Sequence, residues 1–181
     1  MFARLACLGV AVVVAVAFAT PVGAAPEQFP DLSGFTVADV KDYSGYYIYP
    51  TTNGVQFTAP AGYRCRITYT GRANPPFRSA KCWGALPGTS SNVVGVSTGV
   101  VDDPPAAFGD VDPAVMDEYD TLTPDVRVIK KSFGPDDYKP LPPGSRLDYA
   151  KDEVCGVTEQ MTACRVGDHG FVLDPQGSWT F

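Results

Sequence analysis

Four of the five cysteines form two closely spaced pairs, and these pairs constrain the fold more than any other feature of the sequence. A turn-like segment lies between Cys65 and Cys82, and a shorter one between Cys155 and Cys164. Of the three pairings that four cysteines allow, we expect Cys65–Cys82 and Cys155–Cys164, because each would cross-link a single hairpin. Each bond should stabilise the fold by roughly 3 kcal/mol. The alternative is a zinc site, but the sequence lacks the CxxC-like pairs that such a site needs.

The N-terminal residues predict a secretory signal peptide over residues 1–24. A short positive region precedes the uncharged run Leu5–Ala19, and small residues surround a cleavage site after Ala24. A retained membrane anchor is the alternative, but the run is shorter than the roughly 20 residues that span a bilayer. Cys7 lies in the segment to be removed, so we expect it to stay unpaired. Residues 25–181 should form one domain that is secreted or held in the cell envelope, without membrane attachment.

The chain is acidic, with 20 Asp and Glu against 14 Lys and Arg and a formal net charge of −6. A protein of this charge has no electrostatic attraction to nucleic acid or to an anionic membrane, so neither is expected as a partner. The 18 glycines and 17 prolines follow no fixed period. They therefore predict turns and not a fibrous repeat.

Short alternating and aromatic runs predict a mainly β fold. Tyr63–Thr70 has strict period-two alternation, so one face should be core and the other solvent. Asn53-Gly54 predicts a turn between the strands Tyr46–Tyr49 and Val55–Thr58. The other expected strands are Phe77–Trp83, Val126–Phe133, Arg146–Tyr149, Glu153–Val157, Thr162–Val166, Gly170–Leu173 and Trp179–Phe181. Together they predict a small antiparallel sandwich or barrel of short strands with one short helix and long loops.

Two further segments have a different character. Residues 25–32 are polar and contain proline, which predicts a loosely ordered arm. Residues 99–125 contain no Lys or Arg and predict an acidic loop. Within this loop, Asp112-Pro113 is typical of a helix start, so we expect one short helix over Pro113–Asp120.

Calcium binding is an alternative interpretation of the acidic loop. The aspartates that it would use are Asp102, Asp103, Asp110 and Asp112. Their spacing is not that of an EF-hand, and the neighbouring prolines favour a solvated loop. We therefore expect no metal and no other cofactor.

Several segments resemble a known family. They are Val55–Ile67, Leu141–Ser145 and the closing residues Cys155, Cys164, His169, Gly170-Phe171 and Phe181. These segments are similar to the Phe-x-Ser/Thr-Pro-Ser/Ala-Gly-x-x-Cys-x-Ile opening, the Leu-Pro-x-Gly segment and the Gly-His-Gly-Phe ending of small secreted actinobacterial, mycobacterial-type proteins of unknown function. Asp168 departs from the pattern, because glycine is usual there. The resemblance implies export and paired cysteines, and it implies no activity.

A secreted hydrolase is one hypothesis. Gly95–Gly99 matches the G-x-S-x-G pattern with Ser97 as nucleophile, and Asp168 and His169 offer an acid and a base. Such a serine needs a sharp turn leading into a helix, and the two prolines soon after Gly99 exclude that helix. We interpret Gly95–Gly99 as a loop and His169 as a structural residue.

A non-catalytic interaction module is the hypothesis that we favour. Tyr46, Tyr47 and Trp83 are candidates for a surface that binds a protein or glycan partner. Tyr46 and Tyr47 are adjacent and must face opposite sides of a strand, so at least one should be exposed. A third hypothesis, a protease inhibitor, would use the loop Arg72–Arg78.

The two cysteine segments share an order of residues: cysteine, any residue, a β-branched residue, threonine, a bend and a second cysteine. The cysteine and the β-branched residue two positions later face the same side of a strand. We therefore predict two disulfide-crossed hairpins in which Ile67 and Val157 are buried beside the sulfur atoms. The alternative is a coincidence in a threonine-rich chain.

Overall fold

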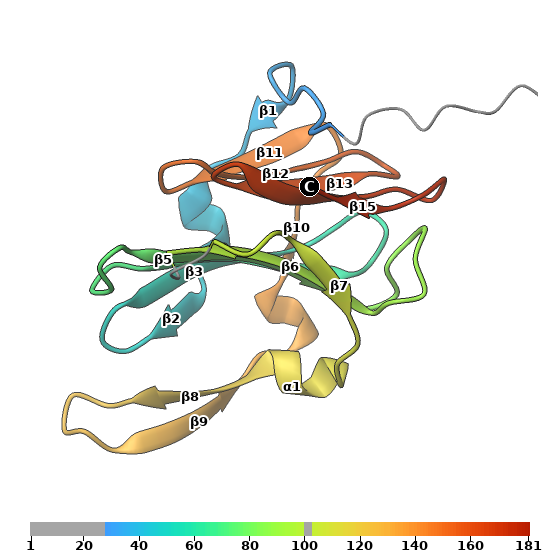
Figure 1. Cartoon of the computed structure of the whole chain (residues 1–181). Coiled ribbons are helices and arrows are strands. Elements are labelled where there is room, and N and C mark those ends of the chain that lie inside the picture. The colour runs from blue at the N-terminus through green and yellow to red at the C-terminus, as the bar shows by residue number, and fades with distance from the viewer. Residues whose placement is uncertain (1–27, 100–102) are drawn as a thin grey trace, which may run out of the picture.

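The computed structural model describes residues 28–99 and 103–181, whose strands form two stacked sheets and a separate hairpin (Figure 1). Sheet A, mostly orange and red, lies above sheet B, which is mostly green, and the hairpin lies beyond sheet B on its other side. The expected mainly β, antiparallel fold with one short α-helix and two disulfides is confirmed for the described residues. The predicted signal peptide and Cys7 lie outside those residues.

Sheet A is built from the C-terminal strands and one early strand. In spatial order its members are β1 (Thr36–Val37), β11 (Ser145–Tyr149), β12 (Glu153–Val157), β13 (Thr162–Val166), β14 (His169–Leu173) and β15 (Trp179–Thr180). Neighbouring strands are antiparallel except β1 and β11, which pair in parallel. The sequence predicted the last five of these strands to within about one residue at each end.

Sheet B contains the middle part of the chain. In spatial order its members are β10 (Lys139–Pro140), β3 (Thr52–Thr58), β4 (Arg64–Thr70), β5 (Phe77–Trp83), β6 (Val93–Thr98) and β7 (Ala107–Gly109), and β2 (Tyr46–Ile48) also pairs with β3. Only β10 pairs in parallel. Val55, Ile67 and Val94 are fully buried on the face toward sheet A, as the alternation of Tyr63–Thr70 predicted for its strand.

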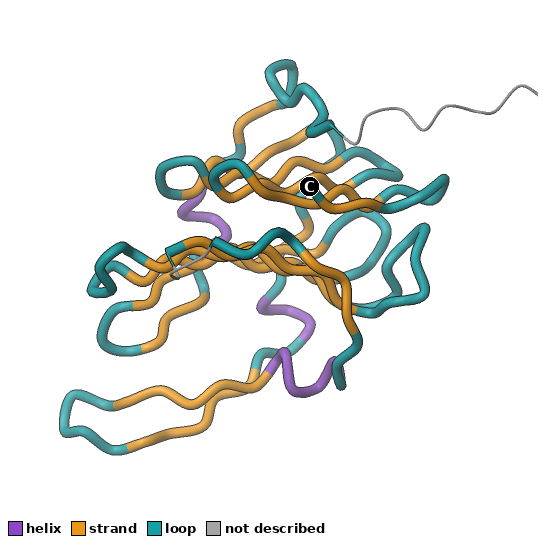
Figure 2. The backbone as a smooth tube through the Cα atoms, in the orientation of Figure 1, coloured by secondary structure: helices purple, strands orange, loops and turns teal. Residues whose placement is uncertain are grey.

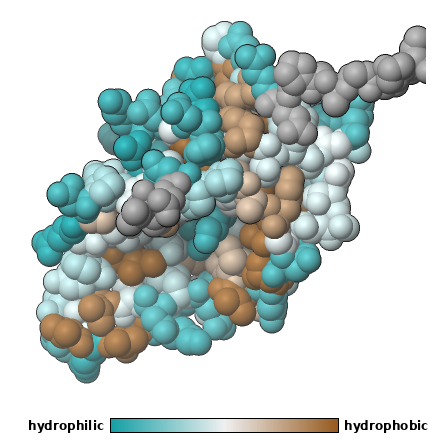
Figure 3. Space-filling model, viewed as in Figure 1, coloured by the Kyte–Doolittle hydropathy of each residue, from teal (hydrophilic) through white to brown (hydrophobic). Residues whose placement is uncertain are grey.

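The separate hairpin consists of β8 (Glu118–Leu122) and β9 (Val128–Ser132) and follows the helix α1 (Pro113–Asp117). Every residue of β9 is exposed, and apolar surface gathers over the outer end of the hairpin (Figure 3). The hairpin therefore depends on contacts at its base to hold its place beside sheet B. Two 3-10 helices, η1 (Val40–Tyr43) and η2 (Pro135–Asp137), complete the described elements. None of these helices is long and apolar enough to cross a membrane.

The helix predicted over Pro113–Asp120 is shorter than expected. Asp112 caps it as predicted, by accepting a hydrogen bond from the backbone of Ala114, but Glu118 is already extended and begins β8. The helix ends early because β8 pairs with β9 and places Thr121 in a buried position. The acidic loop expected over residues 99–125 thus contains part of the hairpin and strand β7 as well.

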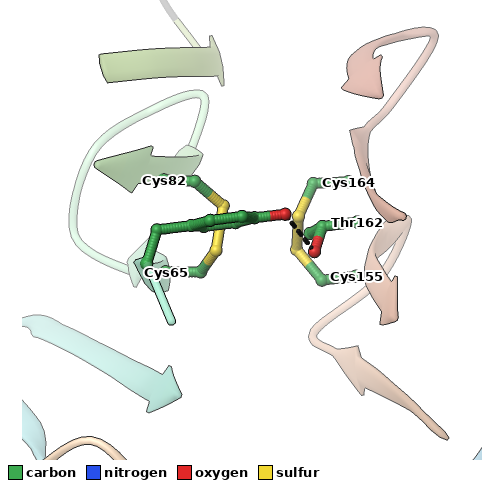
Figure 4. Close-up of a disulfide and its surroundings, with 6 residues drawn as sticks. Cys65, Cys82, Cys155, Thr162 and Cys164 are labelled. Atoms are coloured by element: carbon green, nitrogen blue, oxygen red, sulfur yellow. Dashed lines mark hydrogen bonds between the residues drawn. A yellow bond between two sulfur atoms is a disulfide. The ribbon is translucent and has the colours of Figure 1, made fainter. Parts of the chain in front are cut away.

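The two predicted disulfides, Cys65–Cys82 and Cys155–Cys164, are confirmed, and each joins directly opposed residues of neighbouring antiparallel strands. They face each other across the space between the sheets (Figure 4). Ile67 and Val157 are both fully buried in the same core, as the shared residue order predicted. The interior is thus built around two cross-strand disulfides.

A buried hydrogen bond also connects the two sheets. The hydroxyl group of Tyr63 donates to Oγ1 of Thr162 at 2.7 Å, and this bond is the dashed line that ends at Thr162 beside the Cys155–Cys164 bond (Figure 4). Burial raises the pKa of Tyr63 to about 12, so its hydroxyl group stays protonated and remains a donor at neutral pH. The bond satisfies two polar groups that would otherwise be costly to bury.

The predicted turn at Asn53-Gly54 is wrong. The turn lies at residues 49–51 and is closed by a hydrogen bond from the backbone of Thr51 to that of Ile48, while Asn53 and Gly54 belong to β3 (Figure 2). Gly54 occupies its position for a different reason. A Cβ atom there would lie only 2.5 Å from the carbonyl oxygen of Ile67 on the neighbouring strand, so the residue permits a close approach of two backbones.

The variant Gly54→Ala should therefore be less stable than the wild type by about 2 kcal/mol, because β3 and β4 must move apart to admit the methyl group. Urea denaturation followed by circular dichroism measures the difference. Gly45→Ala is the matched control, since a Cβ atom at Gly45 would meet only Nε2 of Gln56, at 3.8 Å. Equal stability of the two variants would show that the close approach at Gly54 is not a constraint.

Two other segments differ from expectation. Gly95–Gly99 was predicted to be a loop, but its first four residues lie in β6, where small side chains pack on neighbouring strands. Residues 28–32, expected to be part of a loosely ordered arm, pack on the outer face of sheet A. Leu32 is buried against Gly156, and the rings of Phe29 and Phe181 lie 5.8 Å apart.

Candidate functional site

The outer face of sheet B, which points away from sheet A, carries polar side chains in ordered rows. Because paired residues share a face, the strand register places Thr68, Ser79 and Ser97 side by side across three strands. The neighbouring row contains Gln56, Arg66 and Lys81 in the same way. The alternation that buries the cysteines thus presents hydroxyl groups and cations on the opposite face.

A groove of about 290 Å³ runs along this face, and we call it the outer groove. It lies between the strands of sheet B and the elements that cover them, β2 and α1. Its lining residues are Tyr46, Ile48, Thr52, Arg66, Thr68, Thr70, Phe77, Ser79, Lys81, Trp83 and Met116. The lining therefore combines aromatic rings, hydroxyl groups and two cations.

Arg66 is the only lysine or arginine that is buried among the described residues. Its Nε donates to Oε1 of Gln56 at 2.7 Å, and its Nη2 donates to the hydroxyl oxygen of Tyr138 at 2.9 Å. Its guanidinium carbon lies 4.2 Å from the ring centroid of Tyr46 and 5.0 Å from that of Trp83. Aromatic faces thus replace much of the water that the cation loses on burial.

The same cluster anchors the hairpin. The rings of Tyr119 in β8 and Phe133 just after β9 stack with centroids 4.9 Å apart, and both lie against Tyr46 at 5.1 and 5.6 Å. Arg66 lies 5.1 Å from the ring of Phe133. The wall of the outer groove and the base of the hairpin are therefore one continuous set of contacts.

One carboxylate serves this cluster. Asp117 forms an ion pair with Arg64 and accepts a hydrogen bond from the hydroxyl group of Tyr138 at 2.8 Å. Burial raises the pKa of Tyr138, and the hydrogen bond to Asp117 raises it further against the opposing effect of Arg66. Tyr138 therefore stays protonated, and its hydroxyl group accepts a hydrogen bond from Arg66 while it donates one to Asp117. Arg66 itself has no direct carboxylate partner among the described residues.

Hydroxyl pairs line the rest of the groove. Oγ1 of Thr52 and Oγ1 of Thr70 lie 2.8 Å apart, and Oγ1 of Thr68 and Oγ of Ser79 lie 2.7 Å apart. Within each pair one hydroxyl group donates to the other, so each pair keeps an unused O–H donor and unused lone pairs. These groups are available to a polar ligand.

Two donors in the lining have no acceptor within the described part of the chain. The hydrogen bonds of Arg66 come from Nε and Nη2, and Nη1 makes none. The indole N–H of Trp83 is buried and also lacks an acceptor. A buried donor without an acceptor, such as the indole N–H of Trp83, is rare in folded proteins because it is costly. Nη1 of Arg66 is not fully buried, so it can donate to a ligand in the groove.

The aromatic residues predicted to form a binding surface are separated by the fold. Tyr46 and Tyr47 face opposite sides of β2, as expected: Tyr46 lines the outer groove, and Tyr47 is exposed on the other side. Trp83, which was expected on an exposed surface, is almost fully buried beneath Arg66 and Tyr138. Tyr46 and Trp83 therefore share one site, and Tyr47 does not belong to it.

The candidate hydrolase residues are not brought together. Ser97 lies in β6 of sheet B and, as the partner of Ser79, faces the outer side. His169 begins β14 in sheet A, where it pairs with the buried Val166. A sheet thus separates the two side chains, and no hydrogen bond joins them within residues 28–99 and 103–181.

The other candidate segments also lie apart. The loop of the proposed protease inhibitor, Arg72–Arg78, connects β4 and β5 at the end of the hairpin opposite the Cys65–Cys82 bond. Asp103 and Asp110 accept hydrogen bonds from backbone N–H groups, and Asp112 caps α1, whereas Asp102 lies outside the described residues. In the part of the chain that the structure describes, no three acidic, histidine or cysteine side chains gather to hold a metal.

A larger hollow of about 760 Å³ lies on the outer face of sheet A, beside residues 28–33. Its cations are already engaged: Arg146 pairs with Asp148 at 3.2 Å and donates to the backbone of Leu32, and Arg165 lies over the ring of Phe29. The chain that precedes residue 28 is not described. The outer groove on sheet B is therefore the better-defined site.

A buried carboxyl group lies between the sheets, on the opposite face of sheet B from the groove. Glu153 is almost fully buried, and neither of its carboxyl oxygens has a hydrogen-bond partner among the described residues. Burial raises its pKa to about 8, despite the attraction of Arg78, whose Nε lies 4.0 Å from Oε1. The group is therefore largely protonated at neutral pH.

Comparison of the chain with protein-family models, with curated proteins and with solved structures found no match. The assignment of a function therefore rests on the site itself.

Arg66 is the central residue of the site that the sequence did not reveal. The alternation in Tyr63–Thr70 correctly predicts that Arg66 lies on the face away from the core, but it also predicts that this face is exposed to solvent. The signal was present in the unusual composition of that face, with Arg64 and Arg66 on one strand and Lys81 on the next in an otherwise acidic chain.

Proposed function

We propose that the protein is an exported, non-catalytic module that binds carbohydrate in the outer groove. The observation that carries the proposal is that one groove combines aromatic rings with hydroxyl pairs that keep unused donors and acceptors. The apolar faces of sugar rings pack on aromatic side chains, and sugar hydroxyl groups need both donors and acceptors. The volume of about 290 Å³ is at the lower end of small-molecule sites and suits a short sugar segment better than a protein surface.

The scaffold supports this function. The strands that carry the groove, β4 and β5, are joined by the Cys65–Cys82 bond, and their other face is packed in the core. A preformed site loses little entropy when a ligand binds. Disulfides persist in oxidising compartments, so they support a location outside the cytoplasm, either secreted or in the cell envelope.

The variant Phe77→Ala should weaken carbohydrate binding about tenfold, because it removes one aromatic wall of the groove. Phe77 is half-buried on the outer face, so its loss leaves the interior between the sheets intact. The measurement is a screen of neutral and acidic polysaccharides with the mature protein, followed by titration calorimetry on the ligands found.

Tyr47→Ala is the matched control, since Tyr47 is an exposed aromatic residue on the other side of β2. Its affinity should equal that of the wild type. The proposal is wrong if no polysaccharide binds, or if Tyr47→Ala weakens binding as much as Phe77→Ala.

A further inference from the structure

Two cationic residues of the outer groove form no ion pair with a carboxylate among the described residues. Arg66 and Lys81 are directly opposed residues of β4 and β5 and project from the same face of sheet B. Like charges in this arrangement repel each other and destabilise a sheet. Neither residue pairs with a carboxylate in the described part of the chain, and the nearest acidic group of the cluster, Asp117, is engaged by Arg64 and Tyr138.

The position of Lys81 is supported by its neighbour on the other side. Lys81 is opposed on β6 by Gly95, and a Cβ atom at Gly95 would lie 3.1 Å from Cγ of Lys81. The glycine thus makes room for the lysine stem to lie along the sheet. Cδ and Cε of Lys81 also lie 3.6 Å from that Cβ position, so the stem extends over Gly95, on the side of β5 away from β4. The exposed Lys81 and the buried Arg66 both line the outer groove.

This local charge is opposite to that of the whole protein, whose formal net charge is −6. The sheet could avoid the repulsion with a neutral residue at either position. An anionic ligand between the two cations removes the repulsion and also supplies an acceptor for Nη1 of Arg66. Charge and hydrogen bonding thus indicate the same kind of ligand group.

We infer that the outer groove binds an acidic sugar, a uronic acid unit of a polysaccharide, whose carboxylate lies between Arg66 and Lys81. The inference rests on the proposed carbohydrate function and specifies its ligand. The sugar ring then lies over the adjacent hydroxyl row of Thr68 and Ser79, with Phe77 at its side. A phosphate ion satisfies the two cations but leaves the hydroxyl groups and rings unused, so a carboxylated sugar fits the whole groove better.

The test compares oligogalacturonate with its carboxyl-reduced counterpart, which has the same backbone and no charge. The wild-type protein should bind the acidic form at least about tenfold more tightly, and added sodium chloride should weaken only that binding. Lys81→Met keeps the side-chain stem and lies at an exposed position, so the fold is retained. It should lower the affinity for the acidic form about tenfold, and it should reduce the ratio of the affinities for the acidic and the reduced forms.

Lys151→Met, at an exposed turn of sheet A, is the matched control and should bind both forms like the wild type. Equal binding of the two forms by the wild type overturns the inference but leaves the carbohydrate function standing. Binding of neither form, nor of any other polysaccharide, overturns both. If inorganic phosphate or a peptide with a free C-terminal carboxylate binds more tightly than the acidic oligosaccharide, the site recognises that anion and the inference is also wrong.

Discussion

The variant that lacks both disulfides, with Cys65, Cys82, Cys155 and Cys164 changed to alanine, should be unfolded at physiological temperature. The bonds close loops with sequence separations of 17 and 9. Each should contribute about 3 kcal/mol by limiting the unfolded chain, and the two together approach the whole stability of a typical domain. All four sulfur atoms belong to fully buried residues, so their loss also leaves cavities.

Thermal and urea denaturation of the two single-bond variants and of the combined variant measures these contributions. Each single-bond variant should fold with lowered stability. The two bonds face each other in one core, so their effects should not be strictly additive. A combined variant with the melting temperature of the wild type would rule out the disulfides as the main support of the interior.

The stability of the wild type should fall as pH rises from about 4.5 to about 8, through the titration of Glu153. In this range the folded protein keeps a proton that the unfolded chain has already released, because burial raises the pKa of the folded group from 4.5 to about 8. The contribution is fully present below the lower value and is lost above the higher one. Its size is on the order of a few kcal/mol. Arg78 is the charged group that acts on this carboxyl group, and its attraction opposes the effect of burial on the pKa.

Glu153→Gln should remove this slope, since the amide has nearly the same shape and carries no charge at any pH. The variant should match the wild type near pH 5 and exceed its stability near pH 8.5. Urea denaturation at several pH values provides the comparison, and Glu159→Gln, at an exposed turn of the same sheet, is the control. Identical pH dependence in the wild type and Glu153→Gln would show that the carboxyl group is not protonated in the folded state.

Local sequence patterns were sufficient for the two hairpins that the disulfides cross. The alternation in Tyr63–Thr70 and the two short cysteine loops specify which faces point inward, and those faces meet in the structure. Strands near the C-terminus were found because turn residues separate them clearly. In these segments the local pattern and the final packing agree.

Prediction from the sequence failed for residues whose role depends on a contact with a residue far away in the chain. Gly54 looks like a turn residue, but its lack of a side chain serves the approach of Ile67 across the sheet. Gly95–Gly99 looks like a loop because its residues are small, yet small residues are what the position opposite Lys81 requires. Such contacts depend on strand pairing, which short patterns do not encode.

The candidate site was only partly visible for the same reason. Aromatic residues were identified from composition, but Tyr47 proved to be separate and Trp83 proved to be buried. Arg66 was assigned to solvent because the residues that cover it, Phe133 and Tyr138, are far away in the chain. A covering hairpin converts a surface cation into a buried one, and no local pattern predicts that change.

Each disulfide joins two strands that are already neighbours in one sheet, so neither bond ties one layer to the other. Under a mechanical pull on the ends of the chain, the two layers can separate while both covalent links stay intact. The two disulfides prevent only the loops that they close from extending, which shortens the fully stretched chain by roughly 80 Å. The load between the layers is therefore carried by the apolar interior and by hydrogen bonds such as those from Tyr63 to Thr162 and from Arg78 to the backbone of Lys151.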